Sequence, residues 1–229
     1  MPVSDEIDVW LIRLPADGPL PCSFETCLSI EESQRAARFI FERDRARYTV
    51  AHTALRRILA RYTGEDAAAL EFRTAERGKP YLAQHPGLRF NLSHSGCWAL
   101  VAVARSRELG VDIECIRADR STEEIAHRFF APEEVRELME TPPVRRVAAF
   151  FACWSRKEAY IKARGEGLAI PLDSFEVSLG EEAILRKAVD CDRWWMCALH
   201  APEGYAAALV AEGSGWHVRQ LEWTGYPEI

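Results

Sequence analysis

The sequence lacks the patterns by which several large enzyme classes are recognised. It has no Gly-x-x-x-x-Gly-Lys-Ser/Thr loop, no Gly-x-Gly-x-x-Gly fingerprint and no Gly-x-Ser-x-Gly elbow. The sequence therefore does not indicate a P-loop, dinucleotide-binding or α/β-hydrolase function. Ser93 and His94 are adjacent, and neighbours on an extended strand point to opposite faces, so they make a poor nucleophile and base. A Ser-His-Asp enzyme is not expected.

Long apolar runs and paired cysteines are also missing. No stretch approaches the roughly 20 apolar residues of a membrane helix, and an N-terminus carrying Asp5, Glu6 and Asp8 does not have the layout of a signal peptide. The 7 cysteines are odd in number and include no Cys-x-x-Cys, which fits neither a disulfide framework nor a zinc site. We therefore expect a cytoplasmic protein whose cysteines are mostly buried thiols.

The composition is that of a globular chain. With 229 residues and 48% hydrophobic content it can bury a substantial core, as one domain or two small ones. Its net charge of -6 argues against broad nucleic-acid binding. The basic residues are nevertheless uneven, because one N-terminal segment holds Arg35, Arg38, Arg43, Arg45, Arg47, Arg56, Arg57 and Arg61.

Two consecutive helices are predicted in this arginine-rich segment. Ser29-Ile30-Glu31-Glu32 has the form of a capping box that begins the first helix. Asp44 is the expected N-cap of the second. Arg45 and Arg47 would then lie in its first turn, where a positive charge opposes the helix dipole. Arginine in such a place hints at a role other than helix stability.

Helix followed by strands occurs twice along the chain. Strands are predicted at 70–74, 88–93, 98–104 and 109–114, a long helix at 144–164, and further strands at 175–179, 194–199, 205–211 and 217–222. This order favours an α+β fold made of two similar α+β halves, residues 1–106 and 107–229. The halves share no convincing residue-level repeat.

The segment 154–162, Trp-Ser-Arg-Lys-Glu-Ala-Tyr-Ile-Lys, is the most informative stretch of the sequence. On a helix, Glu158 and Lys162 lie one turn apart and share a face between bulky apolar residues. A Glu/Lys pair at this spacing is usually a surface ion pair. The motif alone therefore leaves a functional site and a solvated helix face both open.

A second acidic motif, Gly110-Val111-Asp112-Ile113-Glu114, is predicted to be a strand. Its two-residue period turns Val111 and Ile113 to one side and Asp112 and Glu114 to the other. Two carboxylates about 4 Å apart repel by roughly 4 kcal/mol at an effective dielectric near 20. A hard dication removes that repulsion, and Mg²⁺ commonly shares its ligand shell with substrate phosphates. If the helix motif joins this strand, the set indicates phosphoryl or pyrophosphate chemistry; the alternative is a solvated strand face.

Two further segments present the donor types that hold phosphate oxygens. Gly78-Lys79-Pro80 reads as a turn that presents a lysine, and Phe90 to Gly96 as a strand ending in a polar loop with Ser93 and His94. Hydroxyls, ammonium groups and backbone amides are suitable phosphate donors. The alternative is a surface turn and a loop that bonds to its own backbone.

Taken in order, these four motifs resemble those of the Sfp-type 4′-phosphopantetheinyl transferases, over roughly residues 30–180. The resemblance implies a pseudo-dimer of two α+β halves in one chain, with coenzyme A and Mg²⁺ in the cleft between them. It implies an enzyme of the holo-[acyl-carrier-protein] synthase type. Such an enzyme transfers the phosphopantetheine arm to a serine of an acyl or peptidyl carrier protein and releases adenosine 3′,5′-bisphosphate.

The resemblance also implies roles for individual residues. The metal ligands carry over to Asp112, Glu114 and Glu158, of which Glu158, directly or through a metal-bound water, would accept the proton of the serine. Catalytic assistance comes from Lys162, and the phosphate contacts carry over to Lys79, Ser93, His94 and Lys162. Arg47 falls near the 3′-phosphate of coenzyme A, and Arg35 and Arg38 are further candidates for that region. Glu32 departs from the pattern, because some relatives carry a lysine in this stretch.

Two other functions remain open from the residues. One is a Mg²⁺-dependent nucleotide phosphodiesterase or pyrophosphatase that uses the same carboxylates to deliver water. The other is an inactive regulator that binds coenzyme A, against which the retention of all three carboxylates and Lys162 argues. Internal duplication would let one chain supply a whole cleft, so we expect a monomer without nucleic-acid or membrane partners.

The carrier protein is expected to dock beside the cleft. A helix predicted from Ser121 to Met139 mixes apolar Ile125, Phe129 and Phe130 with charged neighbours. We expect apolar contacts from this helix to hold the carrier, with basic residues steering its approach. The alternative is that both phenylalanines belong to the core.

Overall fold

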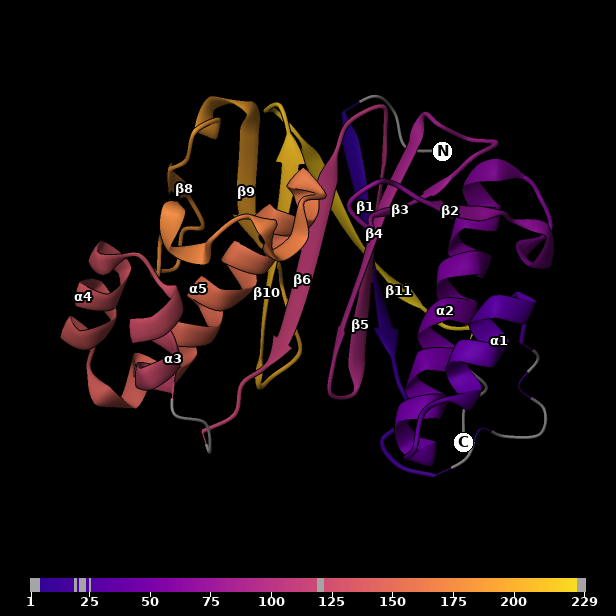
Figure 1. Ribbon diagram of the computed structural model, residues 1–229, viewed down its shortest axis with the longest axis horizontal. Helices are drawn as coiled ribbons and strands as arrows, with labels where there is room; N and C mark the ends of the chain where they lie inside the picture. Colours follow the sequence, from indigo (N-terminus) through magenta and orange to yellow (C-terminus); the bar gives the residue numbers. More distant parts are fainter. Residues whose placement is uncertain (1–4, 19, 21–23, 25, 119–121, 226–229) are drawn as a thin grey trace.

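The computed structural model describes residues 5–18, 20, 24, 26–118 and 122–225. Figure 1 shows two lobes, each with a long helix on the outer side of a sheet, and the two sheets facing each other in the middle. The predicted α+β fold of two similar halves is thereby confirmed. The helices are α1 (Ile30–Ala37), α2 (Glu42–Thr63), α3 (Thr122–Phe129), α4 (Pro132–Glu140) and α5 (Pro143–Arg164).

Each half is built on one main sheet. The N-terminal sheet has the strand order β11-β1-β5-β4 and the C-terminal sheet the order β6-β10-β9. The N-terminal strands are β1 (Glu6–Arg13), β4 (Leu88–Ser95), β5 (Trp98–Arg105) and β11 (His217–Trp223). The C-terminal strands are β6 (Leu109–Cys115), β9 (Trp194–Ala198) and β10 (Tyr205–Glu212). Two small hairpins consist of β2 (Phe72–Thr74) with β3 (Pro80–Leu82) and β7 (Glu176–Val177) with β8 (Leu185–Lys187).

Three apolar layers hold this arrangement together. One lies between α2 and the N-terminal sheet, and another between α5 and the C-terminal sheet. The third joins the inner faces of the two sheets, where Val9 and Leu100 of one half share a cluster with Val111, Ile113 and Leu209 of the other. Burial of each such side chain contributes about 1.5–3 kcal/mol, so the halves form one body with a common core.

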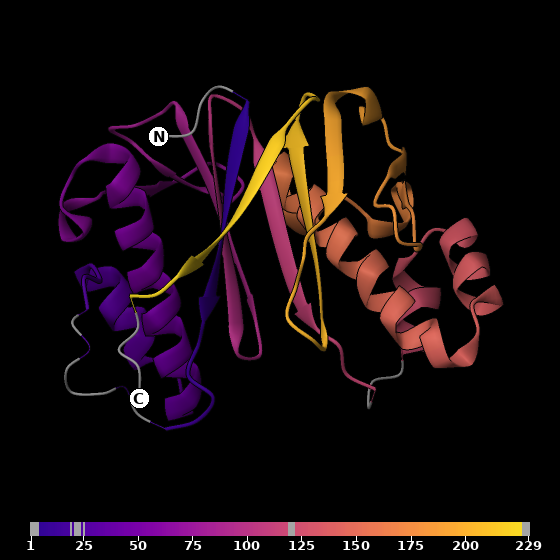
Figure 2. The ribbon, with the colours of Figure 1, turned by 180° about the vertical axis from the view of Figure 1, so that it is seen from behind.

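The last strand of the chain crosses between the halves. β11 pairs in parallel with β1, with Ile7 opposite Val218, and the view from behind in Figure 2 shows it crossing to the N-terminal sheet. The predicted C-terminal half, residues 107–229, thus gives its final strand to the other half. β1 itself has no counterpart among the predicted strands. Ile7, Asp8 and Val9 are all buried, which removes the alternation that reveals a half-exposed strand.

The predicted helix starts are partly right. Ser29 and Glu32 form the expected capping box of α1. The prediction that Asp44 is the N-cap of α2 is wrong, because the helix begins at Glu42 after an extended Phe41 that provides no side-chain cap. Glu42 and Asp44 instead place negative charge in the first turn, which the helix dipole favours. Arg47 therefore lies beyond the first turn.

The helix predicted from Ser121 to Met139 is two helices, and Ser121 lies outside the described residues. Pro132 is the first residue of α4 and has no N–H to continue α3. The Glu134 carboxylate accepts the backbone N–H of Ala131 at 2.8 Å and so caps the start of α4. Phe130 ends up in the core, whereas Phe129 is 36% exposed, so the two phenylalanines have different environments.

The cysteines correct another expectation. Cys22 lies outside the described residues, and the remaining cysteines are free thiols. Only Cys153 among them is buried, because the others lie in loops, at strand ends or on an outer strand. No helix in the described part of the chain is long and apolar enough to cross a membrane. The cytoplasmic location stays a prediction.

Glu32 ties α1 to α2. It accepts hydrogen bonds from Arg56 at 2.6 Å and from the backbone N–H of Ser29 at 2.8 Å, and lies 3.3 Å from His52. Although burial opposes ionisation, these hydrogen bonds from His52, Ser29 and Arg56 lower the pKa of Glu32 to about 2. Its folded pKa is below its ordinary value, so ionised Glu32 stabilises the fold above about pH 4.5, and this contribution is lost as pH falls towards 2.

We expect Glu32→Gln to lower the free energy of unfolding by about 2–3 kcal/mol at pH 7. The difference from wild type should shrink steadily in urea titrations taken from pH 5 to pH 3, where wild-type Glu32 also becomes protonated in the unfolded chain. Glu31→Gln, at the exposed neighbouring position, is the matched control and should stay within about 0.5 kcal/mol. A difference independent of pH would contradict this role of the ionised carboxylate.

Candidate active site

The site is built where β6 packs directly on α5. A Cβ atom added to Gly110 would lie 2.2 Å from the backbone N of Ala163 and 2.3 Å from the carbonyl O of Ala159. Only glycine allows this approach of strand and helix backbones. Asp112, two residues along β6 on the same face, therefore comes to lie beside Lys162 of α5.

Gly110→Ala is expected to destabilise the fold by about 1–3 kcal/mol or more, because the new methyl group meets rigid backbone atoms of α5. The same displacement should separate Asp112 from Lys162 and lower activity in whatever folded fraction remains. Gly180→Ala is the control, since a Cβ there meets nothing within 4 Å. Thermal melts of the two variants check this; equal melting temperatures would show that β6 and α5 can separate without cost.

Asp112 is the most deeply buried carboxylate of the site, at 2% exposed. Its Oδ1 accepts a hydrogen bond from Lys162 Nζ at 2.5 Å and one from Ser93 Oγ at 2.8 Å. Its Oδ2 is buried and has no hydrogen-bond partner. A buried oxygen without a partner is costly, so Asp112 has a free coordination position of the kind that a cation would fill.

Glu114 and Glu158 border the same centre. Glu114 is half-buried and accepts a hydrogen bond from Ser95 Oγ at 2.9 Å. Burial and the charge of Asp112, only partly offset by Lys162, together with the charge of Glu114, raise the pKa of Glu158 to about 7. The charges of Asp112 and Glu114 are thus close enough to Glu158 to disfavour its ionisation.

These donors suit Mg²⁺ better than a metal ion that is coordinated by protein side chains alone. Within the described residues, no three His, Cys, Asp or Glu side chains are gathered closely enough to form a ready-made metal cage. Mg²⁺ is commonly bound by one or two carboxylates, with waters and substrate phosphates completing its octahedron. The orphaned Asp112 Oδ2 and the mutual repulsion at Glu158 fit that mode of binding.

Ser93 and His94 have different environments at the end of β4. Ser93 is 5% exposed and takes part in hydrogen bonds with Asp112, Lys162 and the backbone N–H of Ile113. His94 is exposed. Partial desolvation of its ring and the positive charges of His52, Lys162 and Arg35 lower the pKa of His94, against the opposing effect of Asp112. His94 therefore lies close enough to Lys162 and Asp112 for their charges to act on it.

Lys79 lies apart from the carboxylates. Its ammonium donates to Glu108 Oε2 at 2.7 Å and to the carbonyls of Leu109 and Ala163 at 3.0 Å each. All three donors of the ammonium are therefore used at the junction of the two halves, next to the end of α5. Burial, partly offset by Glu108, lowers the pKa of Lys79.

Arg47 is likewise engaged with the protein. Its guanidinium donates to the carbonyls of Pro15 and Ala16 at 2.9 and 2.8 Å, and to Cys97 Sγ at 3.4 Å. These contacts tie α2 to the loop after β1 and to the turn between β4 and β5. The structure thus joins Ser93, Asp112 and Lys162 directly, with Glu114, Glu158 and His94 around them, and leaves Lys79 and Arg47 in contacts of their own.

Comparison with known proteins decides the family. A model of the 4′-phosphopantetheinyl transferase superfamily matches residues 108–210, and a model described as 4′-phosphopantetheinyl transferase, N-terminal, matches residues 19–106. The chain is 38% identical over 221 residues to the 4′-phosphopantetheinyl transferase HetI of Nostoc sp., covering 93% of this chain and 91% of the relative. The chain belongs to the 4′-phosphopantetheinyl transferases.

A second relative supports the Sfp-type resemblance seen in the sequence. The chain is 35% identical to the 4′-phosphopantetheinyl transferase Sfp of Bacillus subtilis over 159 residues, which is 69% of this chain and 70% of the relative. The predicted family and the prediction of an enzyme are therefore confirmed. The roles of individual residues remain predictions.

The helix motif of the transferase divides into residues that build the fold and residues that face the site. Trp154, Glu158 and Lys162 are spaced four apart and are all half-exposed. Arg156 and Lys157 between them are buried at 3% and 0% exposed. These two cations donate to backbone carbonyls of the segment that follows the helix, namely those of Leu172, Phe175, Ser178, Gly180 and Glu181. The sequence argument concerned only Glu158 and Lys162, although the adjacent basic pair anchors the helix that carries them.

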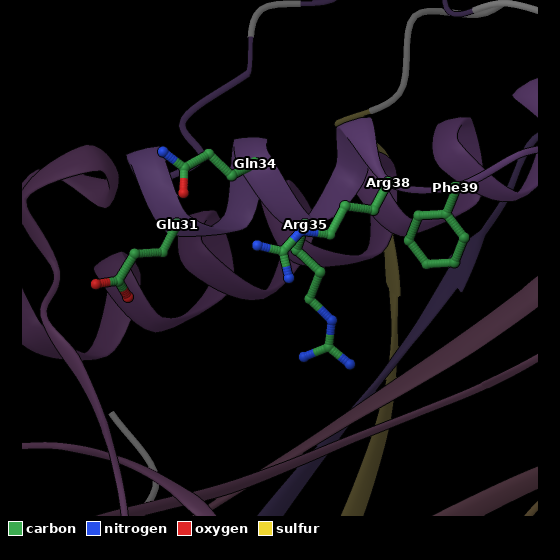
Figure 3. Close-up of a pocket in the computed structure, with 5 residues that line it drawn as sticks. All are labelled: Glu31, Gln34, Arg35, Arg38 and Phe39. Atoms are coloured by element: carbon green, nitrogen blue, oxygen red, sulfur yellow. The ribbon is translucent and has the colours of Figure 1, made fainter.

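A pocket of about 600 Å³ lies on the face of α1 and the turn after it, lined by Glu31, Gln34, Arg35, Arg38 and Phe39. Figure 3 shows the side chains of Arg35 and Arg38 together on this face. Arg35 also stacks its guanidinium 5.7 Å from the ring centre of Tyr48 and lowers the pKa of His94. The two arginines that the sequence marked as further phosphate candidates therefore line one concave surface of the transferase.

Proposed function

We propose that this transferase moves the 4′-phosphopantetheine arm of coenzyme A to a serine of an acyl or peptidyl carrier protein. The reaction depends on Mg²⁺ and releases adenosine 3′,5′-bisphosphate. The observation that carries the proposal is Asp112, whose buried Oδ2 has no partner while its Oδ1 holds the ammonium of Lys162. A carboxylate oxygen without a hydrogen-bond partner, beside a fixed ammonium group, suits a magnesium-bound pyrophosphate.

The residues act on the pyrophosphate by charge and position. Asp112, Glu114 and Glu158 would hold Mg²⁺, which when bound supplies positive charge to the pyrophosphate oxygens and the departing phosphate. Lys162, already oriented by Asp112 and Ser93, supplies a second positive charge on the same side. Glu158, half-exposed on the open face of α5, is the candidate to accept the proton of the incoming serine.

The face of α5 that carries Glu158 continues into an aromatic surface. Trp154 lies one turn before Glu158 and packs edge-on against Phe129, with ring centres 6.3 Å apart. The exposed Arg128 guanidinium lies 5.2 Å from the centre of the Phe129 ring. Apolar contact to Trp154 and Phe129 with basic Arg128 beside them supports docking of the carrier on this surface.

Arg47→Ala is expected to weaken the binding of coenzyme A by about 1.5–3 kcal/mol and to weaken the binding of 3′-dephospho-coenzyme A much less. The reason is a charge-assisted contact to the 3′-phosphate, for which Arg47 would exchange its carbonyl partners Pro15 and Ala16. Calorimetric titration of both ligands checks this. Arg43→Ala, an exposed arginine one turn earlier on α2, is the control. Equal losses for the two ligands would show that Arg47 does not contact the 3′-phosphate.

A product analysis separates transfer from the two alternative functions. Coenzyme A and Mg²⁺ are incubated with the protein, with and without an apo carrier, and adenosine 3′,5′-bisphosphate is quantified by chromatography. Transfer predicts bisphosphate only with the carrier. A phosphodiesterase or pyrophosphatase would cleave coenzyme A without carrier, and a regulator would leave it intact in both samples. Either of those results would overturn the proposed function.

A further inference from the structure

The place where the two main sheets meet is closed by side chains. β4 and β6 are edge strands of different sheets, and no backbone pairing joins them among the described residues. Instead, three side chains on one face of β4 accept N–H groups of β6. The pairs are Asn91 Oδ1 with Val111 N at 2.9 Å, Ser93 Oγ with Ile113 N at 3.4 Å and Ser95 Oγ with Cys115 N at 3.1 Å.

The register of this row is regular. Residues two apart on β4 meet residues two apart on β6, so the polar residues of one strand face satisfy every second N–H of the neighbouring edge. Phe90 and Leu92, on the opposite face of β4, belong to or pack against the core under α2. The polar residues that alternate with apolar ones in this segment thus join β4 to β6, in addition to any contact that they make with substrate.

Each of the two serines also makes the same second contact. Ser93 Oγ donates to Asp112 Oδ1 at 2.8 Å, and Ser95 Oγ donates to Glu114 Oε2 at 2.9 Å. A hydroxyl can accept one hydrogen bond while it donates its single proton. Each serine therefore binds a backbone N–H of β6 and the carboxylate of the residue before it. One arrangement occurs twice, and it fixes one oxygen of each acidic side chain of β6.

We propose that Ser95 is a positioning residue for Glu114, as Ser93 is for Asp112, so that the N-terminal half orients the carboxylates carried by the C-terminal half. The inference rests on the proposed function, because it assigns these carboxylates to Mg²⁺. A donor that fixes one oxygen of a carboxylate restricts the rotation of the whole carboxylate group, and so limits where its oxygens can lie when a metal is bound. Outer partners of metal ligands commonly change metal affinity about 10–100-fold when they are removed.

The test compares Ser95→Ala with wild type in the full chain. We expect the Mg²⁺ concentration for half-maximal transfer to rise about 10-fold, while turnover at saturating Mg²⁺ changes much less. Calorimetric titration of Mg²⁺ in the presence of coenzyme A should show the same shift without any reaction. Ser95→Thr keeps the hydroxyl and should restore tight binding. Ser95→Cys, whose thiol is a weak donor, is the second variant should the alanine protein not fold, and should also bind Mg²⁺ more weakly.

Hydrogen exchange separates positioning from a purely structural role. The amide of Cys115 should exchange faster in Ser95→Ala, because its acceptor is gone. Ser174→Ala, which removes an exposed hydroxyl that donates to the carbonyl of Pro171 in its own turn, is the control for both measurements. Faster exchange with unchanged Mg²⁺ affinity would overturn the proposal and leave Ser95 a structural residue.

The outcome for Ser95 is distinguishable from that for the proposed function. If wild-type protein transfers nothing to any carrier, the function fails, yet a weaker Mg²⁺ affinity of Ser95→Ala in calorimetry still supports the positioning role. If wild type transfers normally and Ser95→Ala keeps the wild-type Mg²⁺ affinity, the function stands and the positioning role is wrong.

Discussion

Asp112→Asn is expected to lower the rate of phosphopantetheine transfer by more than about 100-fold, because in the proposed site it removes a ligand from Mg²⁺ and with it several kcal/mol of charge stabilisation. The substitution keeps the size of the side chain, so it creates no cavity between β6 and α5. It removes the charge that holds Lys162 at 2.5 Å, and the ammonium is then less well placed beside the pyrophosphate. Initial rates in saturating coenzyme A and Mg²⁺ measure the effect.

The control for Asp112 is Asp66→Asn. Asp66 is an exposed residue whose Oδ1 accepts the N–H of Ala68, and asparagine serves equally well at such a cap. Its rate and melting temperature should match wild type. Circular dichroism should show both variants folded. Near-wild-type turnover of folded Asp112→Asn would remove Asp112 from the metal site and with it the main support for the proposed mechanism.

Lys157→Met is expected to destabilise the protein by about 3–5 kcal/mol, enough to abolish most of the stability of a typical domain. Lys157 and Glu134 form an ion pair at 2.7 Å with side chains 0% and 1% exposed. The ammonium also donates to the carbonyls of Leu172 and Phe175 at 2.7 and 2.8 Å. Methionine fills a similar volume but leaves Glu134 as a buried carboxylate without its cation, and burial already raises the pKa of Glu134.

Chemical denaturation of Lys157→Met and Lys187→Met makes the comparison. Lys187 pairs with Glu176 at 3.2 Å and is 73% exposed, so its removal should cost less than about 1 kcal/mol. Lys157→Met with Glu134→Gln should recover part of the stability, because the orphaned charge is gone while the glutamine oxygen can still accept one of the two N–H groups, of Ala131 and Val177, that bind the two carboxylate oxygens of Glu134. Equal losses for the two single lysine variants would contradict the structural importance of the buried pair.

The sequence allowed good prediction of the face of a strand or helix on which a side chain lies, and of the order of helices and strands. The alternation in 110–114 correctly put Val111 and Ile113 on one side of the strand and both acidic residues on the other; the structure shows that the apolar side is buried in the core between the sheets. The four-residue spacing of Glu158 and Lys162 likewise put both on one face of the helix, and the structure shows both partly exposed there. Periodicity reports which way a side chain points, and that was sufficient for these residues.

Contacts between distant segments could not be predicted in this way. Lys79 uses its donors on Glu108, Leu109 and Ala163, and no local pattern shows that the turn carrying it reaches the end of α5. The same holds for the crossing of β11 to β1. The sequence does show that Asn91, Ser93 and Ser95 share one face of β4. It does not show that they accept N–H groups of β6, because no local pattern indicates that β6 lies beside β4.

The mass of the carrier tests the central claim most directly. An apo carrier protein is incubated with the transferase, coenzyme A and Mg²⁺, and its intact mass is then measured. We predict that the carrier gains one phosphopantetheine group, that a carrier with its serine replaced by alanine gains none, and that a chelator of Mg²⁺ prevents the gain. An unchanged carrier mass across acyl and peptidyl carriers, with folded enzyme and Mg²⁺ in excess, would contradict the account.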